Sequence, residues 1–162
     1  MEQYEKVIAT LQELAIDVQL VEHEPVLTTE EANKCIEGVE GVRTKTLFLT
    51  NKKRQNFYLV IMDDAKRLNT NKFKEIVDES KIKMASESEL LEKLGLYPGC
   101  VSPFGLLNHA AHEIRVYLDE AIVNEARMSF HPNTNDKTIF IQTSDLFKFF
   151  NAVGYVLNVI EI

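Results

Sequence analysis

The sequence has little of several features that mark particular protein classes. Its two cysteines are too few for a disulfide framework and fit a reducing compartment. Its apolar runs are short, for example residues 58–62, whereas a membrane-spanning helix needs about 20 apolar residues. The N-terminus is interspersed with acidic residues and has no small-residue cleavage site, so we expect no secretory signal. These absences predict a cytoplasmic globular protein.

The common catalytic and metal-binding motifs are also absent. The chain has no phosphate-binding glycine loop, no G-x-S-x-G and no H-E-x-x-H. Cys35 and Cys100 form no C-x-x-C motif, and we expect Cys35 to be buried on the apolar side of a short helix. His109 and His112 have no third ligand at a diagnostic spacing, so we read them as surface histidines. We therefore predict neither a metal nor a cofactor.

The composition that remains is typical of one folded domain. Of the 162 residues, 45% are hydrophobic and 27% charged, and no repeat or linker divides the chain, so we predict a single domain over residues 1–162. The net charge is −7, yet residues 43–83 contain eleven Lys/Arg and five Asp/Glu, a local balance of +6. This segment is either a basic face that attracts phosphate or a set of scattered, solvated lysines.

Hydrophobic periodicity predicts interleaved helices and strands. Helices are expected over 4–14, 28–35, 69–77, 89–94 and 144–151, and strands over 18–23, 46–50, 57–62, 82–85, 114–118, 128–131, 138–142 and 155–160. A capping box of Thr28 and Glu31 opens the second helix, and Gly95 closes the fourth. Short turns join several strands, so we predict an α+β fold with a mixed, mostly antiparallel, partly closed barrel-like sheet flanked by helices.

Four segments carry residues that secondary structure alone does not require. They are Lys45 at the head of a strand, the loop 95–99 with two glycines and a proline, the turn 102–106, and the polar connection 130–138. Taken singly, each has a structural reading: a strand-edge lysine, a helix stop, or a turn. The adjacent pair Asp63 and Asp64 follows a strand, and we interpret it as a turn because neighbouring strand residues point in opposite directions.

Taken together and in order, these segments resemble a known family. The sequences K-T-L-F-L (45–49), G-L-Y-P-G-C-V-S-P-F-G-L-L-N (95–108) and F-H-P-N-T-N-D-K-T (130–138) are similar to the YbaK/prolyl-tRNA editing family, in particular its free-standing branch. The resemblance covers essentially the whole chain. It implies the fold of that family and a trans-editing hydrolase that cleaves the ester of a mischarged tRNA, alanine on proline tRNA in the most similar branch.

The resemblance also implies partners and site residues. The implied partners are a tRNA, most naturally proline tRNA, and prolyl-tRNA synthetase, with no membrane, no DNA and no cofactor. The implied catalytic positions are Lys45, Gly95, Pro98, Gly99 and His131, and the implied substrate-binding positions are Ser102, Phe104, Gly105, Asp119, Phe130 and Asn133. The chain departs from the family at Asn108-His109, where relatives often have Asn-Asp.

Elementary chemistry is consistent with this activity. An aminoacyl ester is already activated, so positioning of water or of the ribose 2′-hydroxyl lowers the barrier without a strong nucleophile. Amides of the loop 95–99 are candidates for oxyanion binding, Lys45 for holding a phosphate or carbonyl oxygen, and His131 for orienting water or shaping its loop. The basic turn residues Lys52, Lys53 and Arg54 are candidates for contacts with the acceptor stem.

Two alternatives stay open at this point. One is a non-catalytic module that binds tRNA or a synthetase, although a pure binder has less need of the pocket residues Lys45, Gly95–Gly99 and His131. The other is a deacylase for another mischarged tRNA, such as cysteine on proline tRNA or serine or alanine on other tRNAs. The pocket walls that would decide between substrates are not identifiable from the pattern.

Overall fold

The computed structural model describes residues 2–26, 28–109 and 113–162. In chain order these residues form α1 (Gln3–Glu13), β1 (Val18–Glu22), α2 (Thr29–Cys35), β2 (Val42–Asn51), β3 (Phe57–Asp63), α3 (Thr70–Val77), β4 (Ile82–Met84), α4 (Glu87–Leu94), the 3₁₀ helix η1 (Pro103–Asn108), β5 (Arg115–Asp119), the 3₁₀ helix η2 (Glu120–Ile122), β6 (Arg127–Phe130), β7 (Lys137–Gln142), α5 (Thr143–Ala152) and β8 (Leu157–Ile160). The interleaved helices and strands confirm the predicted α+β class.

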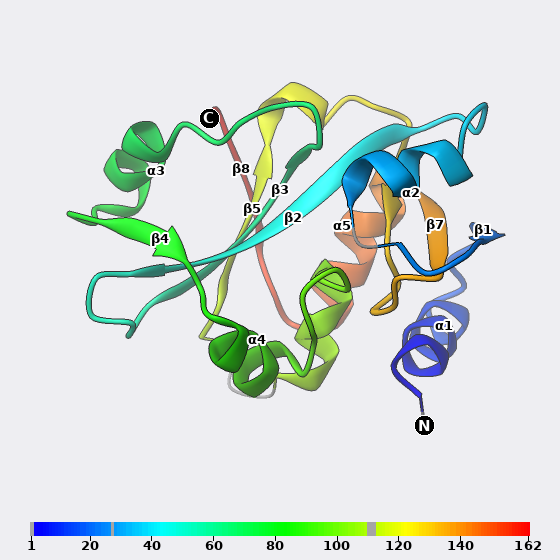
Figure 1. Cartoon of the computed structure of the whole chain (residues 1–162), viewed down its shortest axis with the longest axis horizontal. Helices are drawn as coiled ribbons and strands as arrows, with labels where there is room; N and C mark the ends of the chain where they lie inside the picture. Colours follow the sequence, from blue (N-terminus) through cyan, green and yellow to red (C-terminus); the bar gives the residue numbers. More distant parts are fainter. Residues whose placement is uncertain (1, 27, 110–112) are drawn as a thin grey trace.

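The strands form one mixed sheet in the order β1-β7-β6-β2-β3-β5-β8, with β4 added beside β2. Among the described strands, β1–β7, β2–β3, β2–β4 and β6–β7 pair antiparallel, whereas β2–β6, β3–β5 and β5–β8 pair parallel. The order ends at β1 and β8, so the sheet is not closed into a barrel. The long strand β2 crosses the molecule from the α2 side to the β2–β3 hairpin, which lies beside β4 (Figure 1).

Helix ends follow the signals in the sequence. In α4 the Ser86 hydroxyl accepts from the Glu89 amide and the Glu89 carboxylate accepts from the Ser86 amide, which completes a capping box. Gly95 ends the same helix in the left-handed conformation with φ of 67°. At α2 the Thr28 side chain accepts from the amide of Glu31, which is one of the two hydrogen bonds of the predicted capping box.

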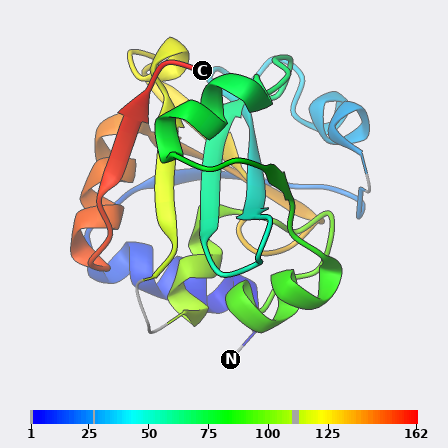
Figure 2. The same cartoon turned by 90° about the vertical axis from the view of Figure 1, so that its left-hand side faces the viewer.

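The central strands are buried on both faces, because helices cover the sheet from two sides. One core cluster, which includes Phe48 and Ile61, is covered by η1 and α5, and the other, which includes Leu49 and Val60, packs on Phe73 of α3. Neighbouring residues of a strand therefore enter different clusters, as the two-residue period requires. Figure 2 shows α5 and α1 on the side of the sheet away from α3.

The structure corrects several local expectations. Strand β2 begins at Val42 rather than at residue 46, because its first residues pair with β6, a segment about 85 positions further along the chain. Residues 103–106 of the predicted turn belong to the 3₁₀ helix η1, and Ser102 is its N-cap. Cys35 is exposed, so its predicted burial is wrong. The side chain of His109 is only 9% exposed, so its reading as a surface residue is wrong, whereas His112 lies outside the described residues.

Candidate functional site

The candidate site lies where β2 and β6 separate. The two strands pair only at Val42–Met128 and Arg43–Ser129, while β2 continues beside β3. At the point of separation the Thr44 amide donates to the Ser129 hydroxyl at 3.3 Å, and the Thr44 hydroxyl donates to the Ser129 carbonyl oxygen. These two bonds close the narrow end of a fork between the strands.

A cavity of about 260 Å³ fills this fork. Its walls come from the segment before α2, from α2 itself, from β2, from the loop after α4 and from β6 and β7, far apart in the sequence. The lining residues are Val26, Thr28, Ala32, Asn33, Ile36, Thr44, Lys45, Thr46, Leu47, Asp64, Gly99, Val101, Ser129, Phe130, His131 and Thr138. The volume is near the lower limit of the ~300–1,000 Å³ typical of small-molecule sites, so the cavity suits a small group.

The cavity brings together residues from all three motifs. Lys45 comes from the first motif, Gly99 from the second, and Phe130 and His131 from the third. Within the described part of the chain, Lys45 has no carboxylate partner within ion-pair distance. Its cation is therefore available to a ligand.

An acidic residue that the sequence patterns did not single out for the site lies in the same cavity. The carboxylate of Asp64 accepts a hydrogen bond from the Asn33 side chain at 2.7 Å, and its amide donates to the Arg43 carbonyl oxygen at 2.9 Å. These bonds hold α2 against the end of β3. The neighbouring Asp63 forms the expected turn, with its side chain accepting from the Ala65 amide at 2.9 Å.

His131 is a neutral hydrogen-bonding group near pH 7. Burial is the main cause that lowers the pKa of its imidazole, and the nearby His23 acts in the same direction, against the carbonyl of Lys137. Its Nδ1 lies 3.3 Å from that carbonyl oxygen, a contact that favours the tautomer with the proton on Nδ1. His23 in turn is within 2.9 Å of the Thr138 hydroxyl on the cavity wall.

Only part of the predicted glycine loop reaches the cavity. The amide of Gly95 is bonded to the carbonyl of Leu91 at the end of α4, so it is not a free donor for a substrate. A side chain at this position would press against Asn108 at 3.2 Å. Gly99, with φ of 87°, lines the cavity, and Pro98 is outside the lining. In this loop, Gly99 is the position nearest to a ligand.

Two further predicted residues support the site from behind. Ser102 is fully buried and donates to the Asn133 side chain at 2.7 Å, while its oxygen accepts from the Phe104 amide at 3.1 Å. Asn133 has a positive φ of 59°, and its amide donates to the carbonyl of His131 at 2.9 Å. The Ser102–Asn133 bond therefore fixes the loop that presents His131.

The remaining predicted substrate residues lie in the core or at another place. Phe104 is fully buried and packs edge-on against Phe130, which lines the cavity. Gly105 is close to the end of α4, because an added Cβ would be 3.2 Å from the Cβ of Leu94 and 2.7 Å from the side chain of Leu96. Asp119 is buried, accepts from the Ala121 amide and forms an ion pair with Lys66 at 2.7 Å, away from the cavity lining.

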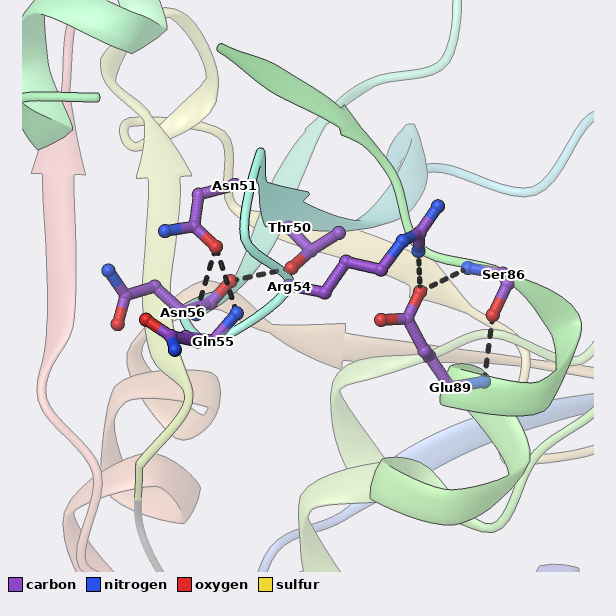
Figure 3. A network of polar contacts seen from close by, with 7 residues as sticks. All are labelled: Thr50, Asn51, Arg54, Gln55, Asn56, Ser86 and Glu89. Atoms are coloured by element: carbon purple, nitrogen blue, oxygen red, sulfur yellow. Dashed lines mark hydrogen bonds and ion pairs between the residues drawn. The ribbon is translucent and has the colours of Figure 1, made fainter. Parts of the chain in front are cut away.

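The predicted basic turn is held rigidly at the other end of β2. The Asn51 side-chain oxygen accepts from the amides of Gln55 and Asn56 at 3.0 and 3.1 Å, and the Thr50 hydroxyl donates to the Asn56 carbonyl (Figure 3). The backbone also bonds across the turn, because the Asn51 amide donates to the Asn56 carbonyl and the Arg54 amide donates to the Asn51 carbonyl.

The turn is also tied to α4. Arg54 forms an ion pair with Glu89, the same residue that completes the capping box with Ser86 (Figure 3). Lys52 and Lys53 are exposed beside it. Of the three predicted tRNA-binding residues, two are free at the surface and the third is already paired.

The site residues that pattern reasoning missed are short polar side chains and strand backbone. Thr44 and Ser129 sit within strands, where a threonine or serine carries no functional signal, and Asn33 lies on a short helix. The Asp63–Asp64 pair was visible in the sequence, but the place of Asp64 in the site depends on the packing of α2 over it.

Across the described residues there is no group of three or more His, Cys, Asp or Glu arranged to hold a metal ion. None of the described helices is long and apolar enough to cross a membrane.

Comparison with known proteins gives one consistent result. The sequence profile of the aminoacyl-tRNA editing domain matches residues 23–149. The chain is 37% identical to the prolyl-tRNA editing protein ProX of Acetoanaerobium sticklandii, over 100% of this chain and 99% of that protein. It is 33% identical to the mouse prolyl-tRNA synthetase associated domain-containing protein 1, over 88% and 86% of the two chains.

A solved structure supports the fold independently. A crystal structure proposed to be a trans-editing enzyme for prolyl tRNA synthetase superposes with a TM-score of 0.77 at 20% identity, covering 100% of this chain and 98% of that one. At that identity the similarity establishes the arrangement of the elements alone.

Proposed function

The chain belongs to the aminoacyl-tRNA editing domain family, and from this premise we propose that it hydrolyses the ester of alanine misloaded on proline tRNA. The coarser activity, deacylation of a mischarged tRNA, follows from the family and from the full-length similarity to a prolyl-tRNA editing protein. The proposal of alanine on proline tRNA is supported above all by one observation, that Lys45, Gly99 and His131 line the same small cavity.

The size of the cavity supports a small amino acid. A synthetase pocket gains only about 1–3 kcal/mol from one methylene, so small amino acids are misloaded and a second, smaller site must remove them. A cavity of about 260 Å³ with strand walls suits this second site, because it accepts an alanyl group and resists a wider ring. In this proposal proline is rejected by shape.

The chemistry proposed for the cavity needs no cofactor. The cation of Lys45 binds the terminal phosphate or the ester carbonyl, and the backbone at Gly99 approaches the oxygen that becomes negative. His131, neutral near pH 7, orients water or the ribose 2′-hydroxyl against the carbonyl carbon, or shapes the loop around it. Removal of one such electrostatic contact costs about 10²–10³ in rate in enzymes where it has been tested.

The tRNA body is proposed to lie along β2 toward the basic turn. Asn51 lies six positions after Lys45 in β2, which at the rise of a strand corresponds to about 20 Å. The exposed Lys52 and Lys53 at the end of the hairpin are then in reach of phosphates of the acceptor stem. Partners under this proposal are proline tRNA and, through it, prolyl-tRNA synthetase, in the cytoplasm.

The test is deacylation of purified alanyl-tRNA(Pro), with cysteinyl-tRNA(Pro), prolyl-tRNA(Pro) and alanyl-tRNA(Ala) assayed beside it. We expect rapid release of alanine from proline tRNA and slow or no release from the other three. Release from cysteinyl-tRNA(Pro) alone would keep the chemistry and replace the substrate. Tight binding of the tRNAs with no hydrolysis of any of them would instead favour a non-catalytic binding module.

A further inference from the structure

One edge of β2 is open at the cavity. On this edge β6 pairs with Val42 and Arg43, and β4 pairs with residues 49–51. In the described part of the chain no strand pairs with this edge between the two, and the cavity is lined by β2 residues 44–47. The open stretch therefore faces the cavity.

The hydrogen bonds at the two ends of β2 show which peptide groups face β3. The Asp64 amide donates to the carbonyl of Arg43, and the Asn51 amide donates to the carbonyl of Asn56. In an antiparallel pair, residues alternate between bonding the partner and pointing away from it. The odd-numbered residues of β2, including 45 and 47, therefore direct their amides and carbonyls toward β3.

The even-numbered residues direct theirs toward the opposite edge. The Thr44 amide donates to the Ser129 hydroxyl of β6, and the Phe48 carbonyl accepts from the Ala85 amide beyond β4. Thr46 lies between these two positions with the same parity. Its N–H and C=O consequently point into the open stretch, side by side, toward the cavity that Thr46 lines.

We infer that the peptide group of Thr46 binds the aminoacyl part of the substrate as one residue of a β-bridge. This inference rests on the proposed function, because it takes an α-aminoacyl ester as the ligand. Such an ester carries an amine and a carbonyl on either side of one α-carbon, as a residue in a strand does. The Thr46 carbonyl accepts from the amine, and the Thr46 amide donates to the ester carbonyl.

This mode of binding divides the work between backbone and side chains. The peptide group recognises what all α-aminoacyl groups share, while the cavity walls decide which side chain enters. A buried carbonyl or amide left without a partner is costly, so a ligand that lacks the amine loses affinity. The contact is independent of the Thr46 side chain, and replacement of that side chain does not remove it.

The test uses two stable probes that differ only in the amine: 3′-(L-alanylamino)-3′-deoxyadenosine and 3′-propionylamino-3′-deoxyadenosine. Amide hydrogen exchange is measured by NMR on the whole chain, free and with each probe. In the free protein we expect the Thr46 amide to exchange at least about tenfold faster than those of Lys45 and Leu47, which bond β3. The alanyl probe is expected to slow exchange at Thr46 and to bind more tightly than the propionyl probe.

Each other outcome is decisive. Exchange at Thr46 as slow as at its neighbours in the free protein would mean that the edge is closed and would overturn the inference. Binding of the alanyl probe that shifts the Lys45 and His131 signals but leaves exchange at Thr46 unchanged would also overturn it, with the proposed function intact. If the alanyl probe does not bind and alanyl-tRNA(Pro) is not hydrolysed, both fail together. Equal affinity of the two probes would exclude the Thr46 carbonyl as the acceptor of the amine.

Discussion

The two ends of β2 differ in how their polar groups are used. At the hairpin end, side chains of the turn bond its own backbone, and Arg54 is paired with Glu89 of α4. At the other end the strand leaves β6, and the edge at Thr46 faces a cavity that also contains Lys45. One strand thus carries a saturated end and an open end, at opposite sides of the molecule (Figure 1).

The difference shows how one strand can hold a surface turn at one end and offer hydrogen-bonding groups to a ligand at the other. A turn whose backbone groups are hydrogen-bonded holds its basic residues at one place on the surface, where they can contact phosphates of a nucleic acid. An open strand edge keeps donors and acceptors available, and this is tolerated here because the cavity gives them access to solvent or ligand. The buried middle of β2, with Phe48 and Leu49 in the two core clusters, holds the ends in register.

The largest effect is expected from the open end. Lys45→Ala removes the free cation of the cavity, and we expect kcat/KM for alanyl-tRNA(Pro) to fall by about 10²–10³. The circular dichroism spectrum and the melting temperature should stay as in the unaltered protein. The matched control is Lys148→Ala, an exposed lysine of α5, which should keep full activity. Hydrolysis at the unaltered rate by Lys45→Ala would remove this residue from the site.

The next effect concerns the support of the open end. Ser102→Ala deletes the buried donor to Asn133 and the acceptor for the Phe104 amide, so we expect the free energy of unfolding to fall by about 1–3 kcal/mol. Urea unfolding measures this change. The exposed Ser144 provides the control variant Ser144→Ala, expected to stay within about 0.5 kcal/mol. Equal stability of the two variants would show that the Ser102–Asn133 bond contributes nothing.

Substitutions in the turn at the hairpin end of β2 should weaken tRNA binding and leave the hydrolysis step unchanged. With Lys52, Lys53 and Arg54 all replaced by Ala, the slope of log affinity against log salt should become shallower by about 0.7–0.9 for each lost phosphate contact. Hydrolysis of a small ester such as alanyl-adenosine should be unchanged. A variant of equal charge, with Arg67, Lys72 and Lys74 replaced by Ala, separates local contacts from net charge. An identical slope in both variants would place the tRNA elsewhere.

The smallest expected effect is a pH dependence of the free energy of unfolding that arises from His131 at the cavity. Burial lowers the pKa of His131 in the folded protein, so below about pH 6.5 the unfolded chain takes up this proton first. The stability that the folded protein gains by keeping His131 neutral is therefore complete above pH 6.5, and it is lost as the pH falls toward the pKa of His131 in the folded protein. Comparison of urea unfolding at pH 7.5 and 5.5 with that of His131→Asn should show a smaller loss in the variant. The same loss in both proteins would assign it to other groups.

Local signals predicted most of the secondary structure. The capping residue Thr28 and the stop at Gly95 are read from neighbours a few positions away, and the structure confirms them. The hairpin 46–62 was also visible, because two strand-like apolar runs flank a polar turn. The first residues of β2 were missed because Val42 and Arg43 are in a strand only through pairing with β6.

Part of the site could be predicted because the chain contains the motifs of the family in the same order. The family resemblance pointed to Lys45, Gly99 and His131, and the structure places all three at the cavity. The same motifs also contain Ser102 and Phe104, which the structure places behind the wall. A motif marks a segment of chain, and it does not state which of its residues faces the ligand.

The sequence by itself determined the elements, the turn chemistry and the family, because each depends on residues close together in the chain or on a recurring order. Only the tertiary structure decided that β2 separates from β6 after Arg43 and that Asp64 reaches the cavity under α2. It also decided that no strand among the described residues pairs with the β2 edge at Thr46. These features arise from contacts between residues up to about 85 positions apart. Strand pairing and helix packing at such separations leave no periodic signal along the chain, and they became visible when the sheet was assembled.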